Sequence, residues 1–366
     1  MYFPHAEQQK RASTVNTDRN RWDKHLQPRC SNVRLREFRT VTGERLLQEI
    51  ARQNDLSKAT LKQLKSLLSA IFKHAKRQGF IDGVNPMQDV SIPKARKSEP
   101  TYAYSLEELN RMLAVLDERS AAIIAVAGFS GLRRSEIQGL RWSDYDGETS
   151  SLHVERSVWE GIVDETKTQA SNEAVPVISA LAKRLGKYRA TLEGKPKVGS
   201  SAAGPAGSLS PDAPIFATSN GAPLRLNNIL RSCILPVLNR CGVCGKGQDE
   251  GEHVRSREIQ APDEGFPSQA SGHLFTRDES LPAWRGWHAF RRGLATNLHD
   301  LGVDDHTIKA ILRHSSVTVT QRSYIKSLPK HSIDAMNTFD ELAGATADLV
   351  HKRDMDPAKR SKQLVN

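Results

Sequence analysis

The segment of residues 92–100 most constrains the fold, because it divides the chain into two regions of different character. It contains two prolines and four charged residues and offers almost nothing apolar to a core. Such a composition favours an extended connection over a packed element. At 366 residues the chain is long enough for two domains. We predict a linker over residues 93–101, domains over residues 1–92 and 102–345, and a flexible tail over residues 346–366.

Positive charge is concentrated before the linker. Residues 1–100 contain 20 lysines and arginines against 10 acidic residues, whereas the rest of the chain contains 33 basic and 32 acidic residues. Phosphate contacts by lysine and arginine supply most sequence-independent affinity for nucleic acid. The first domain is therefore expected to bind nucleic acid, and a merely solvated basic surface is the alternative.

Periodicity predicts that this first domain is all-α. Over residues 58–78 the apolar side chains fall on one helical face, with Gly79 as the stop. Another face of this helix carries the candidate DNA contacts Lys62, Lys65, Lys73 and Lys76. An earlier helix is expected over residues 16–26, ended by Pro28.

The second domain is predicted to be mixed α/β. A capping box, Ser105-Leu106-Glu107-Glu108, opens a helix, and helical material continues to Trp142 with interruptions at Gly128, Ser130 and Gly131. Short β-prone runs separated by turn residues then fill residues 152–178 and predict a small antiparallel sheet. Helices are expected again near Leu226 and from His288 to about residue 345. The predicted fold is mainly α, with one small antiparallel sheet.

Three features bear on location. Four cysteines in a chain of this length do not form a disulfide framework and fit a reducing compartment. The longest apolar run, residues 121–129, is far short of the roughly 20 residues that a membrane span requires. The polar start lacks the apolar stretch of a secretory signal. We expect a cytoplasmic protein with no membrane contact.

A set of reactive side chains occupies the last quarter of the chain. Tyr324 stands ten positions after His314, and His288 and Arg291 lie upstream in the sequence His-Ala-Phe-Arg. A phenol has a pKa of about 10 and is a poor nucleophile at neutral pH. It attacks a phosphodiester only where cations stabilise the developing charge and a base helps to remove its proton. The neighbouring residues offer those groups.

These residues continue a pattern that begins earlier. The sequence Gly-Leu-Arg-Arg-Ser-Glu at residues 131–136 is followed by Lys167, by the His-Ala-Phe-Arg sequence, and by His314 and Tyr324. In order and approximate spacing the set resembles the tyrosine recombinase (phage integrase) family, over residues 13–330. The resemblance implies a family core-binding domain in the basic N-terminal region and a catalytic domain after the linker.

The resemblance also implies a role for each residue. Tyr324 would attack the scissile phosphate, giving a 3′-phosphotyrosyl link and a free 5′-hydroxyl. Arg133 and Arg291 would hold the non-bridging oxygens, a task that suits a planar, permanently charged fork of donors. Lys167 would protonate the leaving 5′-oxygen.

Three further residues complete the implied site. His288 would assist proton transfer at the tyrosine, and His314 would donate to a phosphate oxygen. Glu136, one helical turn after Arg133, would orient that guanidinium. Arg134 is the rival of Arg133 for the register.

As a whole, the resemblance implies a site-specific DNA recombinase that integrates or excises a mobile element or prophage. It would need no ATP and no cofactor, and it would act as a tetramer on paired sites. A type IB topoisomerase and an inactive DNA-binding protein are the alternatives. The first helix lies too near the start for the arm-type DNA-binding domain of many integrases, so the protein works without it or the chain is truncated.

Two departures distinguish this sequence from the family pattern. The usual Leu-Gly-His is Leu312-Arg313-His314 here, and the step from His314 to Tyr324 is one residue longer than the commonest spacing. One added residue in a helix rotates a side chain by about 100°, unless a loop absorbs it.

A polar insertion over residues 240–281 carries a second chemical signal. Cys241 and Cys244 form a C-x-x-C pair, and His253 and His273 follow. Two cysteines and two histidines can make a tetrahedral zinc site, which would organise a segment too polar to fold by burial. Free thiols or redox chemistry are the alternatives. The predicted zinc is structural, because the arginines already supply charge for the cleavage chemistry.

Overall fold

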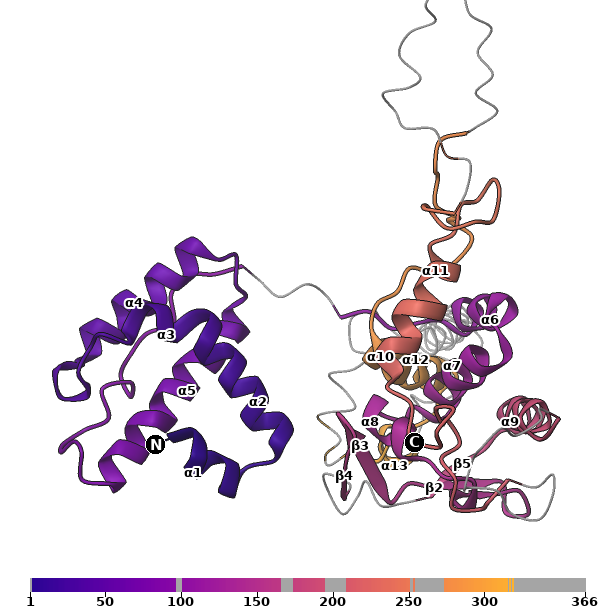
Figure 1. Ribbon diagram of the computed structural model, residues 1–366, viewed down its shortest axis with the longest axis horizontal. Coiled ribbons are helices and arrows are strands. Elements are labelled where there is room, and N and C mark those ends of the chain that lie inside the picture. The colour runs from indigo at the N-terminus through magenta and orange to yellow at the C-terminus, as the bar shows by residue number, and fades with distance from the viewer. Residues whose placement is uncertain are drawn as a thin grey trace, which may run out of the picture. The chain divides into compact units, whose positions relative to one another are not determined.

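The protein is described from a computed structural model of residues 2–96, 101–165, 174–194, 209–250, 253, 273–314, 316 and 318. It divides into two compact units, Met1–Pro100 and Thr101–Asn366, which Figure 1 shows and which are described separately below.

The first unit is helical wherever it has regular structure. Its elements are α1 (Tyr2–Gln9), α2 (Ala12–Arg21), the π-helical turn η1 (Trp22–Leu26), α3 (Gln27–Cys30), the 3-10 turn η2 (Leu35–Glu37), α4 (Thr40–Gln53) and α5 (Lys58–Arg77). The predicted helix over residues 58–78 is thus confirmed as α5. Its start is fixed by Ser57, whose hydroxyl accepts a hydrogen bond from the backbone N–H of Thr60 at 3.3 Å.

The apolar face of α5 forms the centre of the first core. Leu61, Leu64 and Phe72 are buried on it and pack with Leu47 and Ile50 of α4. The charged face remains outside this core, as the periodicity predicts.

The prediction that Pro28 ends the earlier helix is wrong. Helical structure runs on from α2 through η1 to Cys30, and Pro28 lies in the first turn of α3. The π-helical turn η1 directly before Pro28 changes the local hydrogen-bond pattern, which lets helical structure continue past a residue without a backbone N–H.

The second unit contains helices and short strands. Its helical elements are α6 (Leu106–Val115), α7 (Glu118–Ser130), α8 (Arg134–Gly139), η3 (Trp142–Asp144), α9 (Ser179–Glu193), α10 (Leu226–Ile229), η5 (Leu230–Ile234), α11 (Leu235–Leu238), α12 (Trp287–Asp300) and α13 (Asp305–Leu312). Its strands are β1 (Tyr145–Asp146), β2 (Ser151–His153), β3 (Arg156–Trp159), β4 (Ile162–Glu165) and β5 (Ala174–Pro176). The predicted class, mainly helical with a small antiparallel sheet, is confirmed.

Helix α7 lies at the centre of this unit. Residues 120–128 are all buried, and α6, α9 and α12 pack around the helix (Figure 1). The predicted capping box that opens α6 is present, since Ser105 Oγ accepts from the Glu108 N–H at 3.1 Å and Glu108 Oε2 accepts from the Ser105 N–H at 2.8 Å.

The predicted interruption of the helix at Gly128 is wrong. Gly128 lies within α7, where a Cβ would lie 2.5 Å from a methyl carbon of Leu109 in α6. The absent side chain lets α6 approach closely, so this glycine serves packing and does not mark a helix end.

The strands form two separate antiparallel groups. β2 lies between β1 and β5, with Leu152 opposite Tyr145 on one side and Val175 on the other. β3 and β4 form a hairpin in which Val158 faces Val163. The hairpin packs on α8 through β3, near the candidate site described below.

Among the described residues, no helix combines the length and apolar character that crossing a membrane requires.

The close approach of α12 to the backbone at Tyr104 yields a stability prediction. At Gly293 of α12 an added Cβ would overlap the Tyr104 carbonyl oxygen and lie 3.0 Å from the Tyr104 nitrogen. Because backbone atoms cannot rotate away, Gly293→Ala should lower the free energy of unfolding by about 1–3 kcal/mol in urea denaturation.

Gly186→Ala in the exposed part of α9 is the matched control, because nothing lies within 4 Å of its added Cβ. It should raise stability by about 0.5–1 kcal/mol, since alanine favours a helix interior over glycine. Equal effects of the two substitutions would contradict the packing argument.

Candidate functional site

The turn between α7 and α8 carries the first part of the candidate site. Gly131 ends α7 with φ +62°, and a Cβ there would lie 2.7 Å from Leu312 Cδ2. Arg133 precedes α8, and its Nη1 donates to Glu136 Oε1 at 2.7 Å while its backbone N–H donates to Glu136 Oε2 at 2.9 Å. The Arg133 side chain is 31% exposed, whereas Glu136 is buried. Glu136 thus holds a guanidinium that a ligand can still reach.

Arg134, the rival of Arg133 in the sequence, has a different environment. Its Nη1 donates to Asn227 Oδ1 in α10 at 2.8 Å, and this contact is exposed. The geometry thus associates Arg133, rather than Arg134, with Glu136.

Arg291 in α12 links three segments of the site. Its Nε donates to His314 Nε2 at 3.0 Å, its Nη1 donates to the Gly131 carbonyl at 2.7 Å, and its Nη2 donates to the Leu312 carbonyl. Burial, followed by the charge of Arg133, lowers the pKa of Arg291 to about 9, which leaves the group charged at neutral pH. A cation therefore lies where the α7–α8 turn meets the end of α13.

His314 follows α13 and is buried. Arg291 Nε can only donate, so His314 Nε2 accepts and the proton of the neutral ring is on Nδ1. Burial first, and then the charges of Arg291 and Arg133, lower the pKa of His314 to about 3. The imidazole is therefore neutral at physiological pH and can donate one hydrogen bond, from Nδ1.

His288 lies in the first turn of α12, one turn before Arg291. Partial desolvation of the ring, followed by the charges of Arg292 and Arg291, lowers its pKa. A largely neutral imidazole at pH 7 can accept a proton, as a general base must.

Arg313 is a member of this cluster that the sequence analysis did not assign. Its Nη2 donates to Glu136 Oε2 at 2.8 Å, and its side chain is fully buried. Burial alone would raise the pKa of Glu136, but the charges of Arg313 and then Arg133 outweigh it and lower that pKa. The sequence signal was present, because an arginine stands where the family pattern has glycine.

The other residues predicted for the chemistry, Lys167 and Tyr324, lie outside the described residues. The part of the site that is described therefore consists of Arg133, Glu136, His288, Arg291 and His314, with Arg313 beside them.

The four lysines predicted to contact DNA all lie on α5 in the first unit. Lys62 and Lys73 are exposed. Lys65 Nζ donates to the carbonyls of Gln88 and Val90 at 3.1 and 2.6 Å, and Lys76 Nζ donates to the Gly83 carbonyl at 2.6 Å. Two of the four thus also hold the loop that follows α5.

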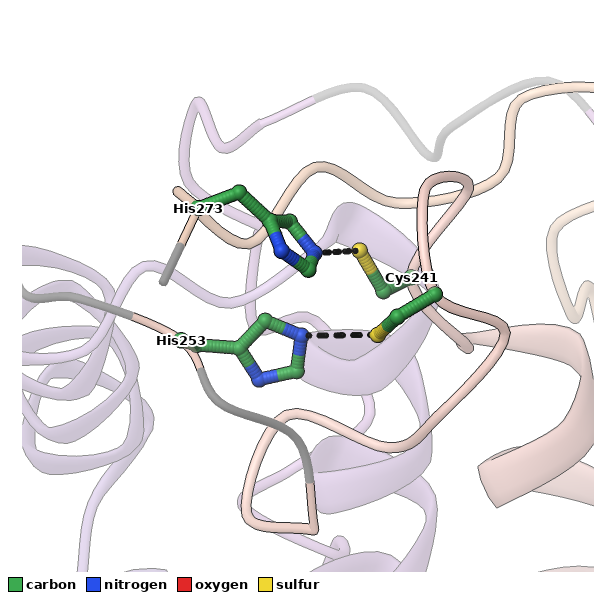
Figure 2. A group of neighbouring side chains, drawn as sticks. Cys241, His253 and His273 are labelled. Atoms are coloured by element: carbon green, nitrogen blue, oxygen red, sulfur yellow. Dashed lines mark hydrogen bonds between the residues drawn. The ribbon is translucent and has the colours of Figure 1, made fainter. Parts of the chain in front are cut away.

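The predicted metal ligands form a second cluster, away from the arginines in sequence. The candidate ligand atoms of Cys241, Cys244, His253 and His273 all lie within 4.8 Å of one another. Cys241 Sγ lies 3.2 Å from His273 Nε2, and Cys244 Sγ lies 3.4 Å from His253 Nε2. Figure 2 shows the imidazole of His273 turned toward the sulfur of Cys241. Sulfur and nitrogen ligands of one tetrahedral zinc are about 3.6 Å apart, given Zn–S of about 2.3 Å and Zn–N of about 2.05 Å.

The chemistry of this cluster suits a metal in two ways. His253 Nδ1 lies 3.0 Å from the Gln248 carbonyl, which can only accept, so Nδ1 carries the proton and Nε2 keeps its lone pair toward Cys244. Burial would raise the pKa of Cys241, but backbone N–H groups, among them that of Val243, and His273 lower it to about 5. Both features match the form in which these residues bind metal.

The chain resembles known tyrosine recombinases in sequence and in fold. No protein-family model matches it. A tyrosine recombinase XerC-like protein of Caldanaerobacter subterraneus is 25% identical over 330 residues, which covers 85% of this chain and 73% of that protein. A tyrosine recombinase XerC of Bacillus pumilus is 24% identical over 277 residues, which covers 74% of this chain and 72% of that protein.

Two solved structures have the same fold. The Tn1549 transposon integrase in complex with transposon right-end DNA gives a TM-score of 0.59 at 18% identity, over 93% of this chain and 98% of that one. A lambda integrase dimer bound to a core site gives a TM-score of 0.54 at 16% identity, over 88% of this chain and 92% of that one. The fold is thus that of the tyrosine recombinases, and the resemblance predicted from the motifs is confirmed.

Proposed function

We propose that this chain is a site-specific DNA recombinase that cleaves and rejoins strands through a 3′-phosphotyrosyl intermediate. The observation that carries the proposal is that Arg291 bonds to His314 and to the Gly131 carbonyl, two residues before Arg133, whose charge acts on both groups. Two guanidiniums beside a neutral imidazole suit a phosphodiester, whose charge grows on the non-bridging oxygens as phosphorus is attacked. The comparisons support the proposal, because the similar structures are integrases solved with DNA.

The proposed reaction assigns each residue one task. Tyr324 Oη forms a bond to phosphorus, the bond from phosphorus to the 5′-oxygen breaks, and Arg133 and Arg291 hold the non-bridging oxygens. The phenolic proton passes toward His288, and Lys167 protonates the departing 5′-oxygen. His314 donates to a phosphate oxygen from Nδ1. Because the ester bond is kept as a phosphotyrosine, attack by another 5′-hydroxyl restores the strand without ATP.

The proposed partner is double-stranded DNA, bound by both units. The basic first unit, with Lys62, Lys65, Lys73 and Lys76 among its contacts, would supply sequence-independent affinity. Each protomer cuts one strand, so we propose that four protomers assemble on two paired sites. We propose that the substrate is the end of a mobile element or prophage and that the protein acts in the cytoplasm.

We also propose that Cys241, Cys244, His253 and His273 hold one structural zinc ion. The four donors come from the turn after α11, from residue 253 and from the segment that begins at residue 273, so one ion would join both ends of the polar insertion. No step of the proposed cleavage uses it. The chemistry requires no cofactor.

Substitution of Tyr324 tests the nucleophile. Tyr324→Phe should still bind DNA, but it should form no covalent complex on a suicide substrate nicked beside the cleavage position, because no oxygen is left to attack. Tyr145→Phe in β1, which is not in the proposed site, should trap the adduct as the unsubstituted protein does. Persistence of the adduct in Tyr324→Phe would assign the nucleophile to another residue.

The alternatives make different predictions in the same system. An inactive DNA-binding protein would form no adduct even without substitution. A type IB topoisomerase would form the adduct and relax supercoils, but it would not exchange strands between two labelled duplexes, whereas the proposed recombinase should.

Conservative replacement tests the two guanidiniums. Arg133→Lys and Arg291→Lys should each slow formation of the covalent complex by about 10²–10³-fold, because an ammonium group cannot provide a planar fork of donors. Their sequence neighbours offer matched controls: Arg134→Lys and Arg292→Lys should stay within about threefold of the normal rate. A large loss in Arg134→Lys with none in Arg133→Lys would reverse the assigned register.

Metal analysis tests the zinc proposal. Purified protein should contain about one equivalent of zinc per chain, and Cys241→Ser should lose it because one thiolate ligand is gone. Cys233→Ser in η5, a free cysteine outside the cluster, should keep the full equivalent. A metal-free protein, or equal metal content in both variants, would refute the site.

A further inference from the structure

Arg313 has a backbone conformation that its residue type disfavours. It ends α13 with φ 55° and ψ 48°, in the left-handed region. Among the described residues, Ser150 and Glu160 are the other non-glycine residues with positive φ, and both lie in exposed turns. A side chain in this region costs roughly 1–2 kcal/mol, and glycine, which the family pattern has here, avoids that cost. Some interaction of the Arg313 side chain must offset it.

The contact with Glu136 supplies that interaction. Arg313 Nη2 lies 2.8 Å from Glu136 Oε2, and the two side chains are 0% and 4% exposed. The other carboxylate oxygen, Oε1, accepts from Arg133 Nη1 at 2.7 Å. One buried carboxylate therefore joins Arg313 to the guanidinium proposed to bind the phosphate. Without Arg313, the buried carboxylate would keep Arg133 as its charge partner but would lose the guanidinium on Oε2.

The guanidinium of Arg313 also changes the net charge of the site. With Arg133 and Glu136 alone, the carboxylate would cancel the positive charge intended for the phosphate. With Arg313 on its second oxygen, the three groups together carry one positive charge, and Arg291 adds another. Because the side chains of Glu136 and Arg313 are 4% and 0% exposed, water screens their charges little.

We propose that Arg313 is a positioning residue for strand cleavage, which holds Glu136 and through it the Arg133 guanidinium while offsetting the carboxylate charge. This inference rests on the proposed function. It differs from the roles that the family resemblance implies, because the family pattern has no side chain at this position.

Replacement by glycine is the direct test, since it removes the guanidinium and also relieves the backbone. Arg313→Gly should fold and bind DNA, yet form the covalent complex on a suicide substrate about 10–100-fold more slowly. Arg313→Lys keeps the charge but not the planar fork of donors. Its rate of covalent-complex formation should fall at least threefold, but by less than that of Arg313→Gly. Ser150→Gly, which relieves a left-handed residue away from the site, should cleave at the normal rate. A normal rate in Arg313→Gly or in Arg313→Lys would overturn the inference.

A double-mutant cycle separates positioning from general damage to the fold. Glu136→Gln removes the charge that Arg313 compensates, so adding Arg313→Gly to it should lower the rate by no more than about threefold further. If the rate loss of the double variant equalled the product of the two single losses, Arg313 would not act through Glu136. Failure of the unsubstituted protein to form any adduct would refute the proposed function itself. An active protein with an unaffected Arg313→Gly would refute only this inference.

Discussion

The arrangement of the site depends on the burial of one carboxylate, that of Glu136, between two guanidiniums. An ionised carboxylate is costly to remove from water unless hydrogen bonds and opposite charges compensate it. Arg133 and Arg313 provide both, at 2.7 and 2.8 Å. Because Arg313 is 177 positions from Glu136 in the chain, the pair also holds the end of α13 against the start of α8. Charge compensation thus joins two segments that are far apart in the chain.

Arg291 extends the same principle to α12. It donates to the carbonyls of Gly131 and Leu312 and to His314, so one side chain joins the turn before α8 to the residues after α13. Burial first, and then the charge of Arg133, lowers the pKa of Arg291, and burial followed by the charges of Arg291 and Arg133 lowers the pKa of His314. Three guanidiniums against one carboxylate also leave an excess of positive charge. A site that is electrostatically unfavourable by itself gains most from an anion, and a DNA phosphate is such an anion.

Local signals predicted the elements that depend on nearby residues. The helix over residues 58–78 and the capping box at Ser105 are set by neighbours within one or two turns, and both were confirmed. Elements defined by distant partners were missed or misjudged. Gly128 was predicted to interrupt a helix, whereas it lies within α7 at a place where Leu109 of α6 leaves no room for a side chain. Helix α9 was also missed, although Leu181, Leu185 and Tyr188 recur at helical spacing and are buried.

Residue order alone establishes which chemical groups are present: a basic helical region, paired arginines and histidines, and two cysteines followed by two histidines. Which of these groups come into contact follows from the folded arrangement. In the structure, Arg133 and not Arg134 pairs with Glu136, and the proton of neutral His314 lies on Nδ1. The candidate ligand atoms of the two cysteines and two histidines lie within 4.8 Å of one another. The folded arrangement also gives Arg313, which looked like a mere departure from a motif, a buried charge partner. The physical reason is that residue type fixes what a side chain can donate or accept. Its partner is fixed by packing between segments that spacing along the chain does not relate.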